Sequence, residues 1–245
     1  MVCPKCSLEQ ADQNIECSRC GIVFKKYHVC QNTLHKINVM PEKENDTAAK
    51  ISFSIKDIFF YVEPGVSPFI FAGRAAFLLV VFIWSWKFIL APMESNYTGA
   101  SFLHLVNLPF HEAGHIVFRP FGEIITSLGG TLGQLLIPLI CLFVFLLKQR
   151  NTFGASISLW WFGENFMDIA PYINDARDME MPLLGGNTGQ TSPYGFHDWE
   201  FILTELGWLR YDHTLANISY RLGTILMLIS FIWGGYILYR QFKNL

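Results

Sequence analysis

Two histidines four residues apart, with a glutamate beside the first, are the side chains that point most directly to chemistry. They are His111, Glu112 and His115. On a helix, positions four apart share one face, so both imidazoles can bind one zinc ion while the carboxylate reaches a water on that ion. Zinc lowers the pKa of such a water, and the carboxylate can pass its proton to a leaving amine. The motif therefore predicts peptide hydrolysis.

The surrounding segment, residues 101–118, is otherwise apolar and also contains His104 and Asn107. Charged groups that face lipid at the centre of a bilayer cost about 3 kcal/mol each. We therefore expect these side chains to face protein or a water-filled cavity. Metal binding would satisfy the two histidines and the glutamate at once, whereas the alternative is a structural cluster bonded to neighbouring helices.

A catalytic zinc ion needs a third protein ligand and an open position. The candidates lie in the segment that begins at Gly163 and ends at Arg177. Asp168 is favoured on physical grounds, because it lies one helical turn from Asn165 inside an apolar stretch, where an unpaired carboxylate is least tolerable.

The order of these motifs resembles the site-2 protease family of intramembrane zinc peptidases. The shared features are His-Glu-x-Gly-His at 111–115, a Gly-rich segment and a span after it, and an Asn-and-Asp motif around Pro171. The resemblance covers roughly Phe69 to Arg177. It implies a membrane zinc metallopeptidase in which an aspartate is the third ligand, and by motif order that aspartate is Asp175.

The sequence departs from the family pattern around this aspartate. Asn165 and Pro171 are six residues apart rather than three, and Ala176 rather than glycine follows Asp175. Asp168 and Asp175 therefore both stay open as ligands. In either case Asn165 would hydrogen-bond a ligand or a substrate carbonyl.

A rival assignment uses Glu164, because Glu164 and Asp168 also fit the Glu-x-x-x-Asp pattern that resembles membrane-bound gluzincin proteases. Glu164 would then be the third ligand of a membrane zinc peptidase of another class. A second rival pair is His197 and Asp198, which could bind or orient a ligand. A capping aspartate before a helix at 199–206 explains this pair more simply.

The amino-terminal segment contains two Cys-x-x-Cys pairs, formed by Cys3, Cys6, Cys17 and Cys20. This spacing is typical of a four-thiolate zinc site and resembles the zinc-ribbon family over residues 1–28. A segment this short depends on metal for folding, and reduced thiols imply a cytoplasmic location. Two disulfides are the alternative. We expect a protein partner for the ribbon rather than nucleic acid, because acidic residues offset its basic ones. Cys30 and Cys141 lack partners at ligand spacing.

Charge and hydrophobicity are segregated along the chain of 245 residues. Charged residues make up only 16%, and the first 66 residues contain 16 of the 38. A polar start with cysteines is not that of a cleavable signal peptide. The net charge of −2 excludes a generally basic surface that coats nucleic acid. The composition after the first 66 residues predicts a multispanning helical membrane protein.

The apolar segments predict a mainly α fold with about four to five membrane helices. The expected spans are residues 69–91, 101–118, 132–147, 153–170 and 218–239, and the Gly-rich segment 122–133 is expected as an embedded loop or hairpin. Five full spans would put the termini on opposite sides, so one segment is expected to cross incompletely. The expected domains are a zinc ribbon at 1–28, a linker at 29–66, and a membrane domain at 67–245 with a polar cap at 171–217.

Together these features predict an intramembrane zinc metallopeptidase with one catalytic and one structural Zn²⁺ ion. Its partners would be membrane lipid and a membrane protein or peptide substrate, with no nucleic acid. We expect a multi-pass protein of a prokaryotic inner membrane with a cytoplasmic ribbon. The alternative from another class is a non-enzymatic membrane scaffold or metal sensor, and a metal transporter is a third, weaker possibility.

Overall fold

The computed structural model describes residues 2–3, 6, 8–9, 11, 14–24 and 55–245. The chain divides into two compact units, Met1–Ser52 and Phe53–Leu245. Most of the expected linker at 29–66 and Cys30 lie outside the described residues.

The larger unit is mainly helical, as the sequence predicts, and its described residues contain isolated bridges but no strand. Polar side chains and prolines set several helix starts: Ser67 accepts the Ile70 N–H just before Pro68, and Asn151 accepts the Gly154 N–H. The helices are α2 (Ile55–Phe59), α3 (Pro68–Leu90), α4 (Phe102–Phe118), α5 (Glu123–Phe143), α6 (Thr152–Asn174), α7 (Asp198–Glu205) and α8 (Asp212–Phe242).

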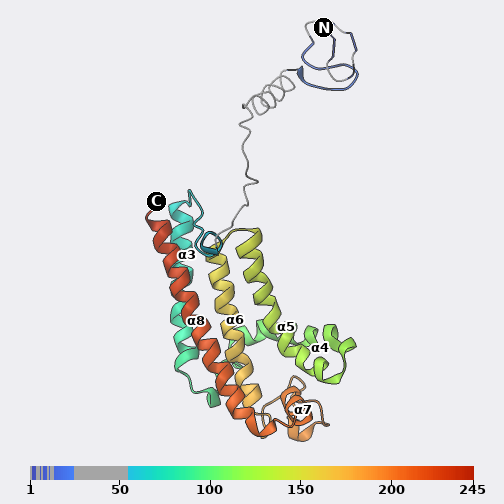
Figure 1. Ribbon diagram of the computed structural model, residues 1–245, viewed down its shortest axis with the longest axis vertical. Coiled ribbons are helices and arrows are strands. Elements are labelled where there is room, and N and C mark those ends of the chain that lie inside the picture. The colour runs from blue at the N-terminus through green and yellow to red at the C-terminus, as the bar shows by residue number, and fades with distance from the viewer. Residues whose placement is uncertain (1, 4–5, 7, 10, 12–13, 25–54) are drawn as a thin grey trace, which may run out of the picture. The chain divides into compact units, whose positions relative to one another are not determined.

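Helices α3, α5, α6 and α8 run side by side in alternating directions, whereas α4 is shorter and lies across one end of this group (Figure 1). Two hydrogen bonds fix the opposite end: Thr152 Oγ1 donates to the Tyr61 carbonyl at 2.6 Å, and Trp233 Nε1 donates to the Phe59 carbonyl at 2.8 Å. The approach to α3, the start of α6 and the last turns of α8 therefore lie together.

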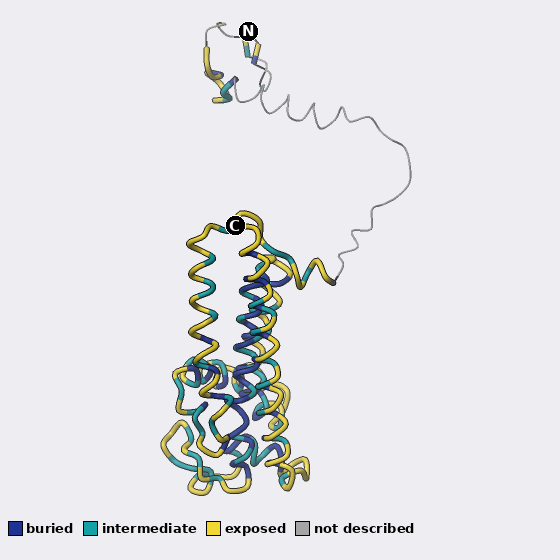
Figure 2. Tube along the Cα trace, turned by 90° about the vertical axis from the view of Figure 1, so that its left-hand side faces the viewer, coloured by how far each residue is buried: buried dark blue, intermediate teal, exposed yellow. Residues whose placement is uncertain are grey.

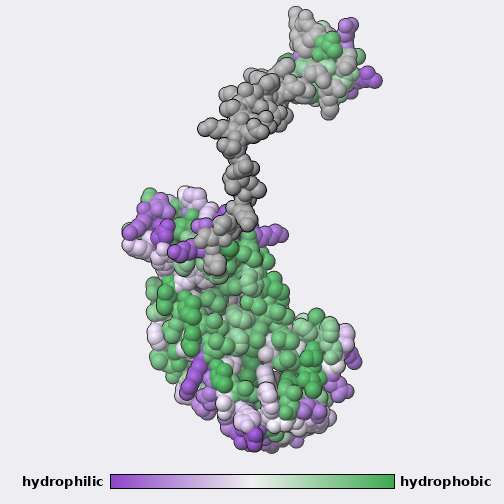
Figure 3. Space-filling view, in the orientation of Figure 1, coloured by the Kyte–Doolittle hydropathy of each residue, from purple (hydrophilic) through white to green (hydrophobic). Residues whose placement is uncertain are grey.

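Within the part of the chain that the structure describes, three helical segments are long and apolar enough to cross a membrane: Pro68–Leu90, Glu123–Lys148 and Leu209–Phe242. The expected spans at 101–118 and 153–170 are not among them. The apolar surface covers the middle of the larger unit, and exposed residues follow the long helices (Figures 2 and 3). A broad exposed apolar surface of this kind is consistent with a membrane protein.

The expectation of an embedded loop at 122–133 is wrong, because this segment forms the first turns of α5. Its glycines serve close helix packing instead. A Cβ added at Gly114 of α4 would lie 2.0 Å from the Gly129 carbonyl oxygen, and one at Gly133 would lie 2.3 Å from the Phe110 carbonyl oxygen. Small residues let the backbones of α4 and α5 touch, which is a common arrangement of closely packed helices.

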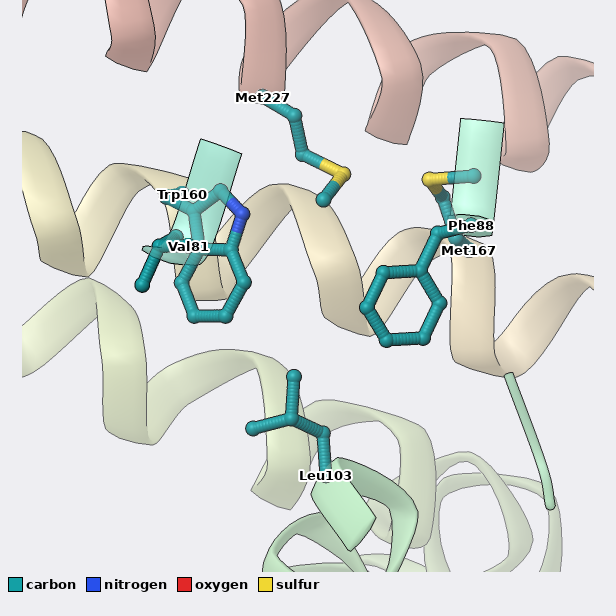
Figure 4. Packing of buried hydrophobic residues seen from close by; sticks show 6 residues of the cluster. All are labelled: Val81, Phe88, Leu103, Trp160, Met167 and Met227. Carbon is teal, nitrogen blue, oxygen red and sulfur yellow. The ribbon is translucent and has the colours of Figure 1, made fainter. Parts of the chain in front are cut away.

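A hydrophobic core joins α3, α4, α6 and α8 (Figure 4). Trp160 of α6 donates its Nε1–H to Ser85 Oγ of α3 at 2.7 Å, so the one polar atom of this ring is satisfied. This packing holds α6 in a fixed position beside the other helices. The buried residues of this core are Val81, Phe88, Leu103, Trp160, Met167 and Met227.

Candidate metal centre

The two histidines of the His-Glu motif meet a single carboxylate oxygen. Oδ2 of Asp198 lies 3.1 Å from Nε2 of His111 and 3.3 Å from Nε2 of His115. Potential ligand atoms of these three residues all lie within 4.8 Å of one another. Two imidazoles and a carboxylate around one point are a donor set that suits a zinc ion with an open fourth position.

The other nitrogen of each ring is held by α5. Nδ1 of His111 lies 2.8 Å from Gln134 Oε1, and Nδ1 of His115 lies 2.8 Å from the Thr126 carbonyl oxygen. A carbonyl oxygen only accepts hydrogen bonds, so each Nδ1 carries a hydrogen, and it is the Nε2 atom of each ring that could bind an ion in the neutral form. Hydrogen bonds of this kind orient metal-binding histidines in other proteins.

Gly130 keeps the space beside both Nε2 atoms open. A Cβ added at this position would lie 2.4 Å from Nε2 of His111 and 2.6 Å from Nε2 of His115. The glycine therefore provides room for an ion where a side chain would fill it.

Replacing Gly130 with alanine is expected to lower zinc affinity at this centre at least about tenfold, because the methyl group displaces both rings and changes that misorient ligands cost about 10–100-fold. Zinc titration of the purified protein would measure the effect. Gly235→Ala is the matched control, since nothing lies within 4 Å of a Cβ added there. Equal affinities of the two variants would contradict the assignment.

Asp198 reaches the histidines because the residue before it caps the helix. The N-cap of α7 is His197, whose Nδ1 accepts the Glu200 N–H at 3.1 Å. Our interpretation of Asp198 as the capping residue is therefore corrected. The Asp198 carboxylate stays available, and its own backbone N–H donates to Tyr172 Oη at 3.0 Å.

Asp175, one of the two predicted ligands, supports Asp198 instead of lying at the histidine pair. Its carboxylate lies 3.2 Å from His197 Nε2 and accepts the N–H groups of Glu180 and Met181 at 3.0 Å each. Because His197 Nδ1 is an acceptor, its Nε2 carries the hydrogen that Asp175 accepts. Asp175 thus fixes the residue that precedes Asp198, and the structure does not bring this predicted ligand to the histidine pair.

Asp168, the other predicted ligand, also lies away from the pair. Its carboxylate bonds His104 Nδ1 at 3.0 Å and Asn107 Nδ2 at 3.1 Å. His104 and Asn107 lie on the turns of α4 that precede His111. Asp168 of α6 therefore contacts α4 before the helix reaches the histidine pair. Glu164 accepts from the same Asn107 nitrogen at 3.0 Å, so neither acidic residue of α6 supplies the carboxylate at the histidines.

The remaining predicted residues have simpler surroundings. Asn165 is fully buried and donates its Nδ2–H to the Trp161 carbonyl of its own helix at 3.0 Å. Glu112 follows His111 directly and is exposed. Its side chain is therefore accessible to solvent beside the first histidine of the pair.

Asp198 is the residue that the sequence-based choice of ligand missed. The available signal was its position beside His197, an adjacent histidine and carboxylate in the polar cap. That signal did not distinguish a metal ligand from a helix N-cap residue. Position along the chain does not show how the polar segment 171–217 folds back onto α4.

The smaller unit brings the four cysteine sulfurs together within 4.8 Å, and all four thiols are free. Each Cys-x-x-Cys pair makes a tight turn: Cys3 N–H donates to Leu8 O and Cys17 N–H to Ile22 O, both at 2.9 Å. Gly21 adopts a positive φ of 67°, which glycine tolerates best. This cluster could bind a metal ion.

The thiols differ in how readily they ionise. The backbone N–H of Cys20 lowers the pKa of Cys17 to about 6. The pKa of Cys6 rises to about 12, because burial and the three neighbouring sulfurs outweigh the lowering effect of the Leu8 N–H. A cation among the sulfurs would allow all four to be thiolates.

No family model, curated protein or solved structure matches this chain. The fold and the sites together define a mainly helical protein whose described residues include three candidate membrane helices and two groups of potential metal ligands.

Proposed function

We propose that this protein is a zinc metallopeptidase that hydrolyses peptide bonds in membrane-embedded or juxtamembrane segments. The observation that carries the proposal is the approach of Nε2 of His111 and Nε2 of His115 to one oxygen of Asp198. When bound, zinc would lower the pKa of a water at its open position and polarise a substrate carbonyl.

The protein's own residues have separate parts in this scheme. His111, His115 and Asp198 would hold the ion, while Gln134 and the Thr126 carbonyl orient the two rings. Glu112 would take a proton from the attacking water and return it to the leaving amine, with no net gain or loss of protons.

The surroundings of α4 favour a substrate in or beside the membrane. Ile116 and Val117, which follow His115, are exposed by 75% and 64%. An apolar surface next to the ligands suits an apolar substrate segment.

We also propose a topology with the start of α3 and the end of α8 on the cytoplasmic side. Arg150 lies over the Tyr61 ring at 4.5 Å, and Arg240 is in the last turn of α8, so positive charges gather at one end of the larger unit. A reporter enzyme fused after Leu245 should be active only as a cytoplasmic fusion. Activity as an exported fusion would overturn this orientation.

The four cysteines would hold a second, structural zinc ion in a cytoplasmic ribbon that docks a protein partner. Replacing Cys17 by serine should remove one zinc ion and loosen this unit, since metal binding supplies most of the folding energy of such segments. Limited proteolysis and zinc analysis would measure this, with Cys141→Ser as the control. Unchanged zinc content would contradict a structural zinc site.

The proposed activity can be tested with the purified full-length protein in detergent and a library of quenched fluorescent peptides with apolar cores. Cleavage that stops on zinc chelation and returns on adding zinc would support the peptidase. If the zinc-loaded protein cleaves nothing, the alternative of a membrane scaffold or metal sensor is favoured.

A further inference from the structure

A second buried polar cluster lies between α4 and α6, apart from the metal centre. It consists of His104 and Asn107 on α4 and of Glu164 and Asp168 on α6, and we refer to it as the carboxylate cluster. Glu164 is fully buried, and Asp168 is exposed by only 7%. The proposed peptidase chemistry uses none of these four residues.

A single amide nitrogen joins the two carboxylates. Nδ2 of Asn107 donates to Glu164 Oε2 at 3.0 Å and to Asp168 Oδ2 at 3.1 Å. The amide is held in this orientation because its oxygen accepts the Trp161 Nε1–H at 2.8 Å. Two carboxylates that share one donor in a buried site repel each other when both are ionised.

The group that can offer a positive charge to the cluster is His104, and it contacts Asp168 rather than Glu164. Both oxygens of Asp168 lie within 3.2 Å of His104 Nδ1, whereas Asp168 is the ionisable group that acts on Glu164. Oε1 of Glu164 is buried and has no hydrogen-bond partner among the described residues. A charged carboxylate in this position would lack both a counter-ion and a full set of donors.

Among the described residues, Asp168 is the charged group that acts on Glu164, and α8 adds none beside it. Gly163 and Met167 of α6 pack against Gly223 of α8, where a Cβ added at Gly223 would lie 2.5 Å from the Gly163 carbonyl oxygen. The face of α6 next to Glu164 therefore meets α8 through backbone and apolar atoms. A neutral carboxylic acid is the form that this environment stabilises.

We propose that the carboxylate cluster is a binding site for one exchangeable proton, which rests on Glu164 and enters through His104. The His104 side chain is 36% exposed and so can take up a proton from outside. The His104 Nδ1–H would pass its proton to Asp168, 3.0 Å away, and His104 would take up another proton from outside. The proton would then move on to Glu164, whose Oε2 and Asp168 Oδ2 share the Asn107 amide. The route is independent of the metal centre and of the proposed peptidase activity.

Infrared spectroscopy of the full-length protein at neutral pH tests the resting place of the proton. The wild type should show the C=O stretching band of a buried carboxylic acid, and Glu164→Gln should remove it, whereas the surface control Glu123→Gln should keep it. The amide has the shape of the protonated acid, so we expect the variant to fold and to keep its zinc. Absence of the band in the wild type, or its survival in Glu164→Gln, would overturn the proposal.

Two further variants test the route and keep the proposal open to refutation if Glu164→Gln fails to fold. Asp168→Asn removes the repelling charge, so the band should disappear at a lower pH than in the wild type. His104→Phe should slow the shift of the band in heavy water at least about tenfold. If the carboxylic-acid band titrates and exchanges identically in the wild type, Asp168→Asn and His104→Phe, both the proton site and its entry path are contradicted.

Discussion

Replacing Asp198 by asparagine is expected to remove the zinc ion of the metal centre and to abolish peptide cleavage, while the cysteines keep their ion. The substitution preserves size but removes the charge that both His111 Nε2 and His115 Nε2 face. Changes to groups behind a ligand already cost about 10–100-fold in metal affinity, so loss of a ligand charge should cost more than about 100-fold. Zinc content and zinc titration of the purified variant would measure this.

Asp168→Asn is the matched control for this prediction, because it removes the same charge from a buried aspartate that bonds His104 and Asn107. We expect this variant to keep two zinc ions. The reverse result, with zinc lost in Asp168→Asn and kept in Asp198→Asn, would show that the ligand predicted from the sequence is right and that Asp198 is not the ligand.

Replacing Glu112 by glutamine is expected to lower turnover about 10²–10⁴-fold, the range over which a positioned general base acts. The amide cannot accept a proton at neutral pH, yet it leaves His111, His115 and Asp198 unchanged. Zinc content should therefore stay at the wild-type value. Initial rates of peptide cleavage at saturating zinc would separate this effect from metal loss.

The Glu112 variant also separates an enzyme from a scaffold. Glu123→Gln, which changes an exposed glutamate at the start of α5, controls for loss of surface charge and should keep full activity. Full activity in Glu112→Gln would remove this residue from the mechanism, and equal losses in both variants would point to a general effect of charge.

The histidine pair was predictable from the sequence because its geometry is local. Residues four apart on a helix share a face whatever the rest of the fold does. Both histidines lie on α4, and their ring centroids are 4.8 Å apart. The mainly helical class was predictable for a similar reason, since long apolar segments need their backbone hydrogen bonds satisfied internally.

The third residue at the pair was not predictable, because it depends on how a polar segment folds back onto α4. The argument for Asp168 was that a buried carboxylate needs a partner, and it is correct in that respect. The partners are His104 and Asn107 rather than a metal ion. Resemblance to a family pointed to Asp175, which acts one step away through His197.

The Gly-rich segment shows a different limit of sequence reasoning. Glycines at 129, 130 and 133 are typical of irregular backbone, but they are equally typical of helices in close contact. The choice depends on the partner helix, since Gly114 of α4 supplies the matching small residue. Gly130 is needed for a different reason, because a side chain at this position would fill the space beside the two imidazoles.

The most direct test of the metal centre is the number of zinc ions bound by the purified, intact protein and by a variant in which His111 and His115 are both alanine. We expect two ions in the wild type and one in the variant, with the remaining ion held by the four cysteines. One ion in the wild type that survives the double substitution would mean that these histidines and Asp198 hold no zinc, and the proposed peptidase would fail with them.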